Sequence, residues 1–170
     1  MKNIFFIIAL LCSSSVAFGQ DIFSAARTND TTYAKQYVLN QGVIDTANVR
    51  GFTPLILAIY NDSYEVAQLL IENGANVNAQ DKSGNTALMG AVFKAYPRMV
   101  TLLLASKVDV NQQNFNGATA LIFAATFGQA DIAKNLLASG ADKSIKDNTG
   151  KTALDNATSQ ENNAMEEILK

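Results

Sequence analysis

The sequence predicts an all-α fold, a solenoid of stacked helix-turn-helix units with short β-hairpin-like loops between them. Gly51, Gly84, Gly117 and Gly150 follow one another at intervals of 33 residues, and each opens the same phrase: GFTPLILA, GNTALMGA, GATALIFA and GKTALDNA. The first three phrases are each followed by a second apolar segment with helical spacing. Self-similarity at a fixed period of this length is typical of repeat architectures.

Each phrase is expected to begin the first helix of its unit. A threonine stands two residues after the glycine, where its hydroxyl can accept a hydrogen bond from a free N–H of the first helical turn. Pro54 fits the first helical position, where its missing N–H costs nothing. A leucine and an alanine three residues apart lie on one face of the helix, and the small alanine lets neighbouring units approach closely. These positions are Thr53, Thr86, Thr119 and Thr152; Leu55, Leu88, Leu121 and Leu154; Ala58, Ala91, Ala124 and Ala157.

The second helix of each unit shows an apolar stripe, at i, i+3 and i+4 spacing in the first two units and at i, i+4 and i+5 spacing in the third. The stripes are Val66, Leu69 and Leu70; Met99, Leu102 and Leu103; Ile132, Leu136 and Leu137. Gly74 and Gly140 are predicted to end two of these helices in the left-handed conformation, which glycine adopts without strain. Lys107 takes this place in the remaining unit, so the cap there is less favourable.

These phrases resemble the ankyrin-repeat family, whose pattern is G-x-T-P-L-H-x-A, then a leucine-rich helix, G-A-x-V-N and a hairpin. The resemblance covers nearly all of residues 20–170. Two departures stand out. Only Pro54 keeps the proline, and the usual histidine is replaced in every unit, a loss expected to weaken local rigidity but not the fold. The replacing residues are Ile56, Met89, Ile122 and Asp155.

The resemblance implies a single ankyrin-repeat domain over residues 20–170. We expect an N-terminal capping repeat, three full repeats and a C-terminal capping repeat, because terminal repeats need a polar outer face. The first repeat has a degraded second helix with Tyr33, Tyr37 and Val38 on its apolar stripe; in the last, only Met165, Ile168 and Leu169 are apolar. The expected units are residues 21–50, 51–83, 84–116, 117–149 and 150–170.

Residues 1–19 are predicted to be a cleaved signal peptide. Lys2 supplies a positive start, residues 4–11 an apolar run too short to span a membrane, and Ala17 and Gly19 the small residues of a cleavage site. The segment is similar to bacterial signals of Gram-negative type, which predicts a periplasmic or secreted protein. Cys12 leaves lipidation open as a minor alternative, although the preceding Leu11 does not fit a lipobox.

The composition of the chain argues against several classes of function. The chain has no histidine, which removes the commonest general base and the commonest metal ligand, and no nucleophile set or phosphate loop is visible. We therefore expect no enzyme activity, no cofactor and no metal. The formal net charge of −2 and the lack of a basic stripe argue against nucleic acid. The carboxylates of Asp45, Asp109 and Asp142 are interpreted as turn residues.

The family resemblance implies a concave binding face, made from the hairpin tips and the exposed sides of the first helices. Aromatic and arginine side chains are favoured anchors at protein interfaces, so the aromatic residues form a candidate hot-spot line. The alternative is that Phe52, Phe93 and Phe127 only pack between repeats. The candidate positions are Arg50, Phe52, Tyr60, Asn61, Lys82, Asn85, Phe93, Lys94, Phe115, Asn116, Thr126, Phe127 and Lys151.

The predicted function is that of an exported module binding another protein, an accessory or immunity-type protein in the bacterial periplasm. A secreted effector that binds host proteins is the alternative. Four basic candidates, Arg50, Lys82, Lys94 and Lys151, predict an acidic partner surface. We expect a monomer with no membrane attachment once the signal is removed.

Overall fold

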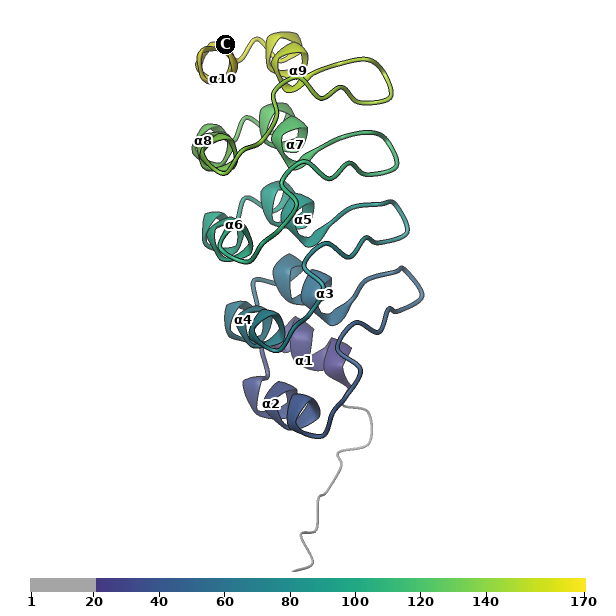
Figure 1. Cartoon of the computed structure of the whole chain (residues 1–170). Coiled ribbons are helices and arrows are strands. Elements are labelled where there is room, and N and C mark those ends of the chain that lie inside the picture. Colours follow the sequence, from purple (N-terminus) through teal and green to yellow (C-terminus); the bar gives the residue numbers. More distant parts are fainter. Residues whose placement is uncertain (1–20) are drawn as a thin grey trace, which may run out of the picture.

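The computed structural model describes residues 21–170, and the predicted signal peptide with Cys12 lies outside them. The described part of the chain contains ten helices in five antiparallel pairs, stacked along one axis (Figure 1). The helices are α1 (Ile22–Thr28), α2 (Thr31–Leu39), α3 (Pro54–Tyr60), α4 (Tyr64–Glu72), α5 (Ala87–Phe93), α6 (Pro97–Leu104), α7 (Ala120–Thr126), α8 (Ala130–Ala138), α9 (Ala153–Ser159) and α10 (Asn163–Leu169).

The helices form two columns. The odd-numbered inner helices pack on one another in chain order, and each packs on the even-numbered outer helix that follows it. The loops that join the pairs project to one side of the stack, on the right in Figure 1. We call these loops fingers; they span residues 40–53, 73–86, 105–119 and 139–152. Within residues 21–170 the only β interaction is a bridge from Gln80 to Thr86, so the predicted all-α solenoid is confirmed.

The four repeated threonines begin the inner helices α3, α5, α7 and α9, as predicted. Each Oγ1 accepts a hydrogen bond from the backbone N–H three residues later. The donors are Ile56 at 3.2 Å, Met89 at 3.3 Å, Ile122 at 3.3 Å and Asp155 at 3.2 Å. Pro54 occupies the first turn of α3. The capping hydroxyls satisfy N–H groups that a helix cannot pair internally.

The core runs through the whole stack between the columns. Leu55, Leu88 and Leu121 are each 1% exposed, and the alanine three residues after each of them is fully buried. Three of the residues that replace the family's histidine are buried in this core: Ile56, Met89 and Ile122. The fourth, Asp155, is exposed, and its carboxylate closes a capping box with Thr152. The apolar replacements therefore add to the core.

The outer helices end as the sequence predicts. Gly74 and Gly140 have φ values of +88° and +90°, and Lys107 is held in the same left-handed region at +57°. A left-handed residue with a Cβ costs roughly 1–2 kcal/mol, so the end of α6 is strained at Lys107.

The two ends of the stack differ in polarity. In the first repeat Ala34 is buried, while Tyr33 and Tyr37 are half-buried and stacked with ring centroids 6.3 Å apart. In the last repeat Met165 and Leu169 turn inward and are buried, and most of the remaining side chains of α10 face solvent. The polar outer face of the last repeat is what a terminal repeat needs.

Candidate protein-binding surface

Each finger is folded around one Asn or Asp that stands three residues before the repeated glycine. Its Oδ1 accepts two backbone N–H bonds from the residues two and four positions later, with distances between 2.8 and 3.1 Å. The four residues are Asn48, Asp81, Asn114 and Asp147. Because one side chain holds both strands of the finger tip, the tips keep a fixed shape without a regular sheet.

Backbone hydrogen bonds connect neighbouring finger tips. Lys82 N–H donates to Arg50 C=O at 3.2 Å, Phe115 N–H to Ser83 C=O at 3.1 Å, and Asn148 N–H to Asn116 C=O at 2.9 Å. The main chain thus fixes the spacing of the tips, while the side chains of Arg50, Lys82, Phe115 and Asn116 are exposed. These four predicted site residues lie on a rigid framework, free to contact a partner.

Of the three carboxylates singled out in the sequence, those of Asp109 and Asp142 accept local turn bonds, whereas that of Asp45 joins two repeats. Asp45 accepts a bond from Asn76 N–H at 2.9 Å, in the next repeat, and Asp109 accepts one from Asn111 N–H at 3.0 Å. Asp142 accepts bonds from the hydroxyl and N–H of Ser144, and these bonds lower the pKa of its carboxyl.

At the N-terminal side of the stack, Phe52 and Tyr60 form one aromatic pair. Their rings stack with centroids 5.6 Å apart, and both side chains are half-buried. Burial and the negative charge of Asp81 raise the pKa of the Tyr60 phenol. The ring of Tyr60 also lies over Gly90, where an added Cβ would come within 2.8 Å of it. The pair therefore belongs partly to the packing between repeats.

Farther along the inner column, Phe93 and Phe127 meet edge to face with ring centroids 5.3 Å apart. Phe123 lies against Phe127 at 6.0 Å. Phe93 remains 49% exposed and Phe127 46% exposed, so packing between repeats takes up only part of each ring. The rings contact one another between repeats, and about half of each remains available to a partner.

The remaining predicted residues are polar. Asn61 and Lys94 are exposed at the ends of α3 and α5, and Lys151 is exposed just before α9. The amide of Asn85 is half-buried and donates to Asp81, and its oxygen accepts from Asn114, so it supports the fingers. The Thr126 hydroxyl donates to Ile122 C=O.

An open pocket of about 190 Å³ lies beside Phe127. Its wall includes Thr126 and Phe127, which the sequence pointed to, and five residues that it did not: Ala118, Ile122, Phe123, Asp147 and Asn156. These residues come from α7, from α9 and from the finger tips, which no single sequence window joins.

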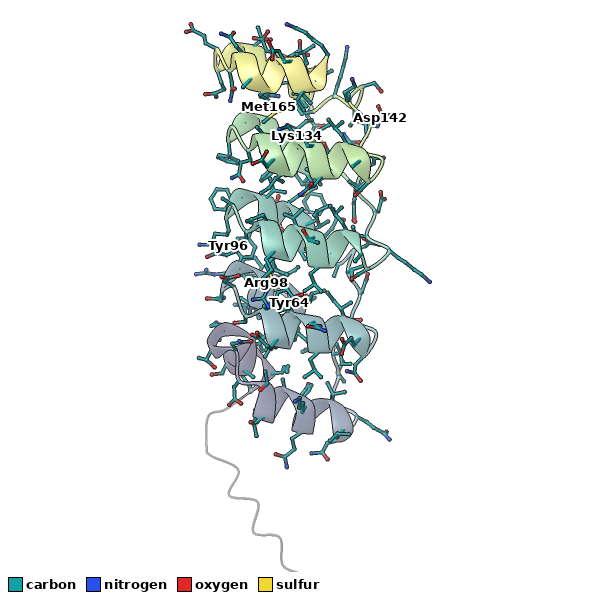
Figure 2. All side chains as sticks on the ribbon, turned by 90° about the vertical axis from the view of Figure 1, so that its left-hand side faces the viewer. Tyr64, Tyr96, Arg98, Lys134, Asp142 and Met165 are labelled. Atoms are coloured by element: carbon teal, nitrogen blue, oxygen red, sulfur yellow. The ribbon has the colours of Figure 1, made fainter. Side chains whose placement is uncertain are left out.

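The opposite side of the stack, formed by the outer helices, carries a different cluster (Figure 2). The Arg98 guanidinium lies 3.5 Å from the centroid of the Tyr64 ring and 3.8 Å from the carboxylate of Glu65. Asn29 donates to Glu65, which lowers the pKa of that carboxyl, and accepts a bond from Val66 N–H. Because these groups bind one another across three repeats, we interpret the cluster as a clamp that joins them.

The fold and surface define a helical repeat protein with a long inner face, meaning the exposed sides of the inner helices together with the fingers. A family model described as ankyrin repeats (3 copies) matches residues 6–81, 22–114 and 88–170. The chain belongs to the ankyrin-repeat family, whose repeats are protein–protein interaction modules. No curated protein matches the chain.

In residues 21–170, no group of three or more Cys, Asp or Glu side chains could hold a metal ion. None of the helices in this part of the chain has the length and apolar character needed to cross a membrane.

Proposed function

We propose that this protein binds a partner protein on its inner face. The observation that carries the proposal is the aromatic row of Tyr60, Phe93 and Phe127, which crosses three consecutive repeats on α3, α5 and the end of α7. Aromatic side chains supply large contact area at interfaces, and partly exposed rings on a preorganised framework lose little entropy on binding.

The charges beside this row favour an acidic partner. Arg50 and Lys82 stand on adjacent finger tips, and Lys94 ends α5. All three side chains are exposed, and none forms an ion pair within residues 21–170. Lys151 is the fourth exposed cation and lies beside the Asp147 carboxyl, whose pKa is lowered mainly by the Thr149 hydroxyl and to a smaller extent by the charge of Lys151. Unpaired cations steer an acidic surface into place and raise the rate of association.

The biological setting we propose is the periplasm or the outside of a bacterial cell, reached through the signal peptide at residues 1–19. In that setting the protein acts as a monomer, as an accessory subunit of an exported enzyme or as an immunity-type protein. The apolar run and the small residues before position 20 support export. A shift in the mass of the chain isolated from its host, to that of a protein starting at Gln20, is the expected result; an intact Met1 terminus would contradict export.

A crosslinking pull-down from the host tests the binding proposal. Tagged protein is compared with a variant carrying Tyr60→Ala, Phe93→Ala and Phe127→Ala. We expect one protein to be crosslinked to the wild type and lost from the variant. If that protein is an exported enzyme, the accessory role is supported; if it is a toxin, the immunity role is supported. The control is Tyr64→Ala, which removes an aromatic ring from the outer face and should keep the partner.

Charge reversal tests the acidic partner. Lys82→Glu with Lys94→Glu should slow association with the captured protein by at least tenfold at low salt, with little change at high salt. An unchanged rate would refute the acidic surface.

The proposed monomeric state has its own test. Light scattering at increasing protein concentration should give the mass of one chain.

A further inference from the structure

The pocket beside Phe127 occupies the place that an aromatic pair fills in an earlier repeat. Phe52 and Tyr60 stand one and nine residues after the repeated glycine Gly51. At the same two places after Gly117 the chain has the small residues Ala118 and Thr126. In the first case the two rings stack on each other at 5.6 Å. In the second case both small residues line the open pocket.

The walls of the pocket suit a planar apolar group. The rings of Phe123 and Phe127 and the side chain of Ile122 line it. Two of its polar lining groups donate locally: the Thr126 hydroxyl to Ile122 C=O at 2.8 Å, and the Asn156 amide to Thr152 C=O at 2.9 Å. The Asp147 carboxylate holds the finger turn. A ligand therefore meets apolar walls and few polar groups that would have to be desolvated.

The volume also fits one ring. The pocket measures about 190 Å³, and an apolar cavity of about 150 Å³ is known to take benzene. Ring contacts in edge-to-face or offset geometry are favourable by about 0.5–1.5 kcal/mol beyond the area that they bury. Phe123 and Phe127 already contact each other at a tilt and can offer such contacts to a third ring.

We propose that the pocket is the anchor site for an aromatic side chain of the partner, carried on an acidic polypeptide segment. This rests on the proposed function and specifies its chemistry. A segment with its ring between α7 and α9 and its chain running toward α5 approaches Lys94 at the end of that helix, and Lys82 stands on the finger tip that precedes it. Both are exposed cations without ion pairs in the described chain. Neighbouring helices are about 8–10 Å apart, and an extended residue spans about 3.3 Å. From a ring between α7 and α9, α5 is about one and a half such spacings away, so the segment should carry its first acidic residue about four positions from the aromatic residue.

Two substitutions fill the pocket with groups that the stack already accommodates. Thr126→Phe copies Phe93, the residue at the same place in the preceding repeat. Ala118→Phe copies Phe52. The two positions are equivalent, because each donates its backbone N–H to the asparagine at the centre of its finger. The matched control is Thr101→Phe on the outer helix α6, where the threonine is exposed and its hydroxyl also bonds to the carbonyl four residues earlier.

The probe is a display library of random 12-residue peptides, selected on the purified protein. Enriched peptides are synthesised, and their Kd is measured by fluorescence polarisation against the wild type and the variants, after circular dichroism has shown which variants are folded. We expect a shared aromatic residue with Asp or Glu about four positions away. Replacing that aromatic residue with alanine should weaken binding at least tenfold. Thr126→Phe and Ala118→Phe should do the same, and Thr101→Phe should not.

The alternatives separate the two proposals. Peptides that lose affinity with Phe93→Ala but bind the two filled-pocket variants like the wild type would overturn the anchor site and leave the inner face as the binding surface. Peptides unaffected by Phe93→Ala and by filling the pocket would contradict both proposals. A selection that enriches no peptide, or enriches peptides with no shared aromatic residue, would also overturn the anchor site.

Discussion

Phe93 and Phe127 contact each other edge to face across a repeat boundary, although they stand at different positions of their repeats. Phe93 lies nine residues after Gly84, and Phe127 lies ten residues after Gly117. This shift of one position leaves Thr126 at the place where a ring would otherwise stand. The same shift that brings the two rings together thus opens the pocket beside them.

The contact between these rings should couple their contributions to stability. Phe93→Ala and Phe127→Ala should each destabilise the protein by about 1 kcal/mol, because both rings are only half-buried. In a double-mutant cycle the loss for the pair should be smaller than the sum by about 0.5–1 kcal/mol. Urea unfolding gives the free energy of unfolding of the wild type, the two single variants and the double variant. Strictly additive losses would show that the rings do not stabilise each other.

Gly84 and Gly150 offer a matched pair of substitutions. Both have a left-handed backbone, with φ values of +78° and +81°. A Cβ on Gly84 would lie 2.6 Å from the backbone nitrogen of Phe115, whereas one on Gly150 would meet nothing within 4 Å. Gly150→Ala should cost about 1 kcal/mol from conformational strain alone, and Gly84→Ala should cost at least twice as much. Thermal unfolding compares them, and equal losses would contradict the close packing of the fingers.

Helices α4 and α5 each start at a residue with a buried hydroxyl, and removing these two hydroxyls should change the free energy of unfolding differently. Thr86 is 2% exposed and caps α5, so Thr86→Ala should destabilise by about 1 kcal/mol. Ser63 begins α4 without a side-chain cap, and its buried hydroxyl has no hydrogen-bond partner in the described structure. Ser63→Ala should therefore be neutral or stabilising, since it removes a buried polar group that gains nothing from burial. A loss of 1 kcal/mol or more on Ser63→Ala, seen in urea unfolding, would refute this assignment.

Acid should weaken the C-terminal repeat. The N–H and hydroxyl of Thr152 hold the pKa of the Asp155 carboxyl below its usual range, and the hydroxyl of Thr149 does the same for Asp147. A lowered folded-state pKa contributes stability that is present above the unfolded value, near 3.9, and is lost as the pH falls through the folded value. Amide exchange in α9 should accelerate more, relative to α5, at pH 3 than at pH 6. Asp155→Asn should reduce this difference, and an unchanged pH response would contradict the role of the capping box.

Much of the fold was predictable because its causes are local. The threonine caps, the left-handed turns after α4 and α8 and the buried leucines each depend on residues within one or two helical turns. The clamp of Arg98, Glu65 and Asn29 was not predictable, because it joins three repeats through side chains that are ordinary solvent-exposed residues in sequence. The Asn or Asp at the centre of each finger was visible in the sequence, because Asn48 and Asp81 are separated by the same 33 residues as the repeated glycines.

The proposed binding surface was predictable only in outline. Family positions indicated Phe93 and Phe127, and both are partly exposed, but Phe123 went unnoticed because it lies one turn before the expected positions. The pocket depends on what is missing at residues 118 and 126, and small residues give no signal until their neighbours are known. Asn85 is the opposite case: the sequence indicated it as a contact residue, but its side chain bonds to Asp81 and Asn114 and stabilises the fingers.

Site-specific photocrosslinking in the host tests most directly whether the inner face is the binding surface. A benzophenone amino acid replaces Lys94 on the inner face in one strain and Thr101 on the outer face in another; both residues are exposed. We expect a discrete crosslinked product from position 94 and none from position 101, with the product lost when Phe127→Ala is added. A product from position 101 alone would place the partner on the outer helices and contradict the account.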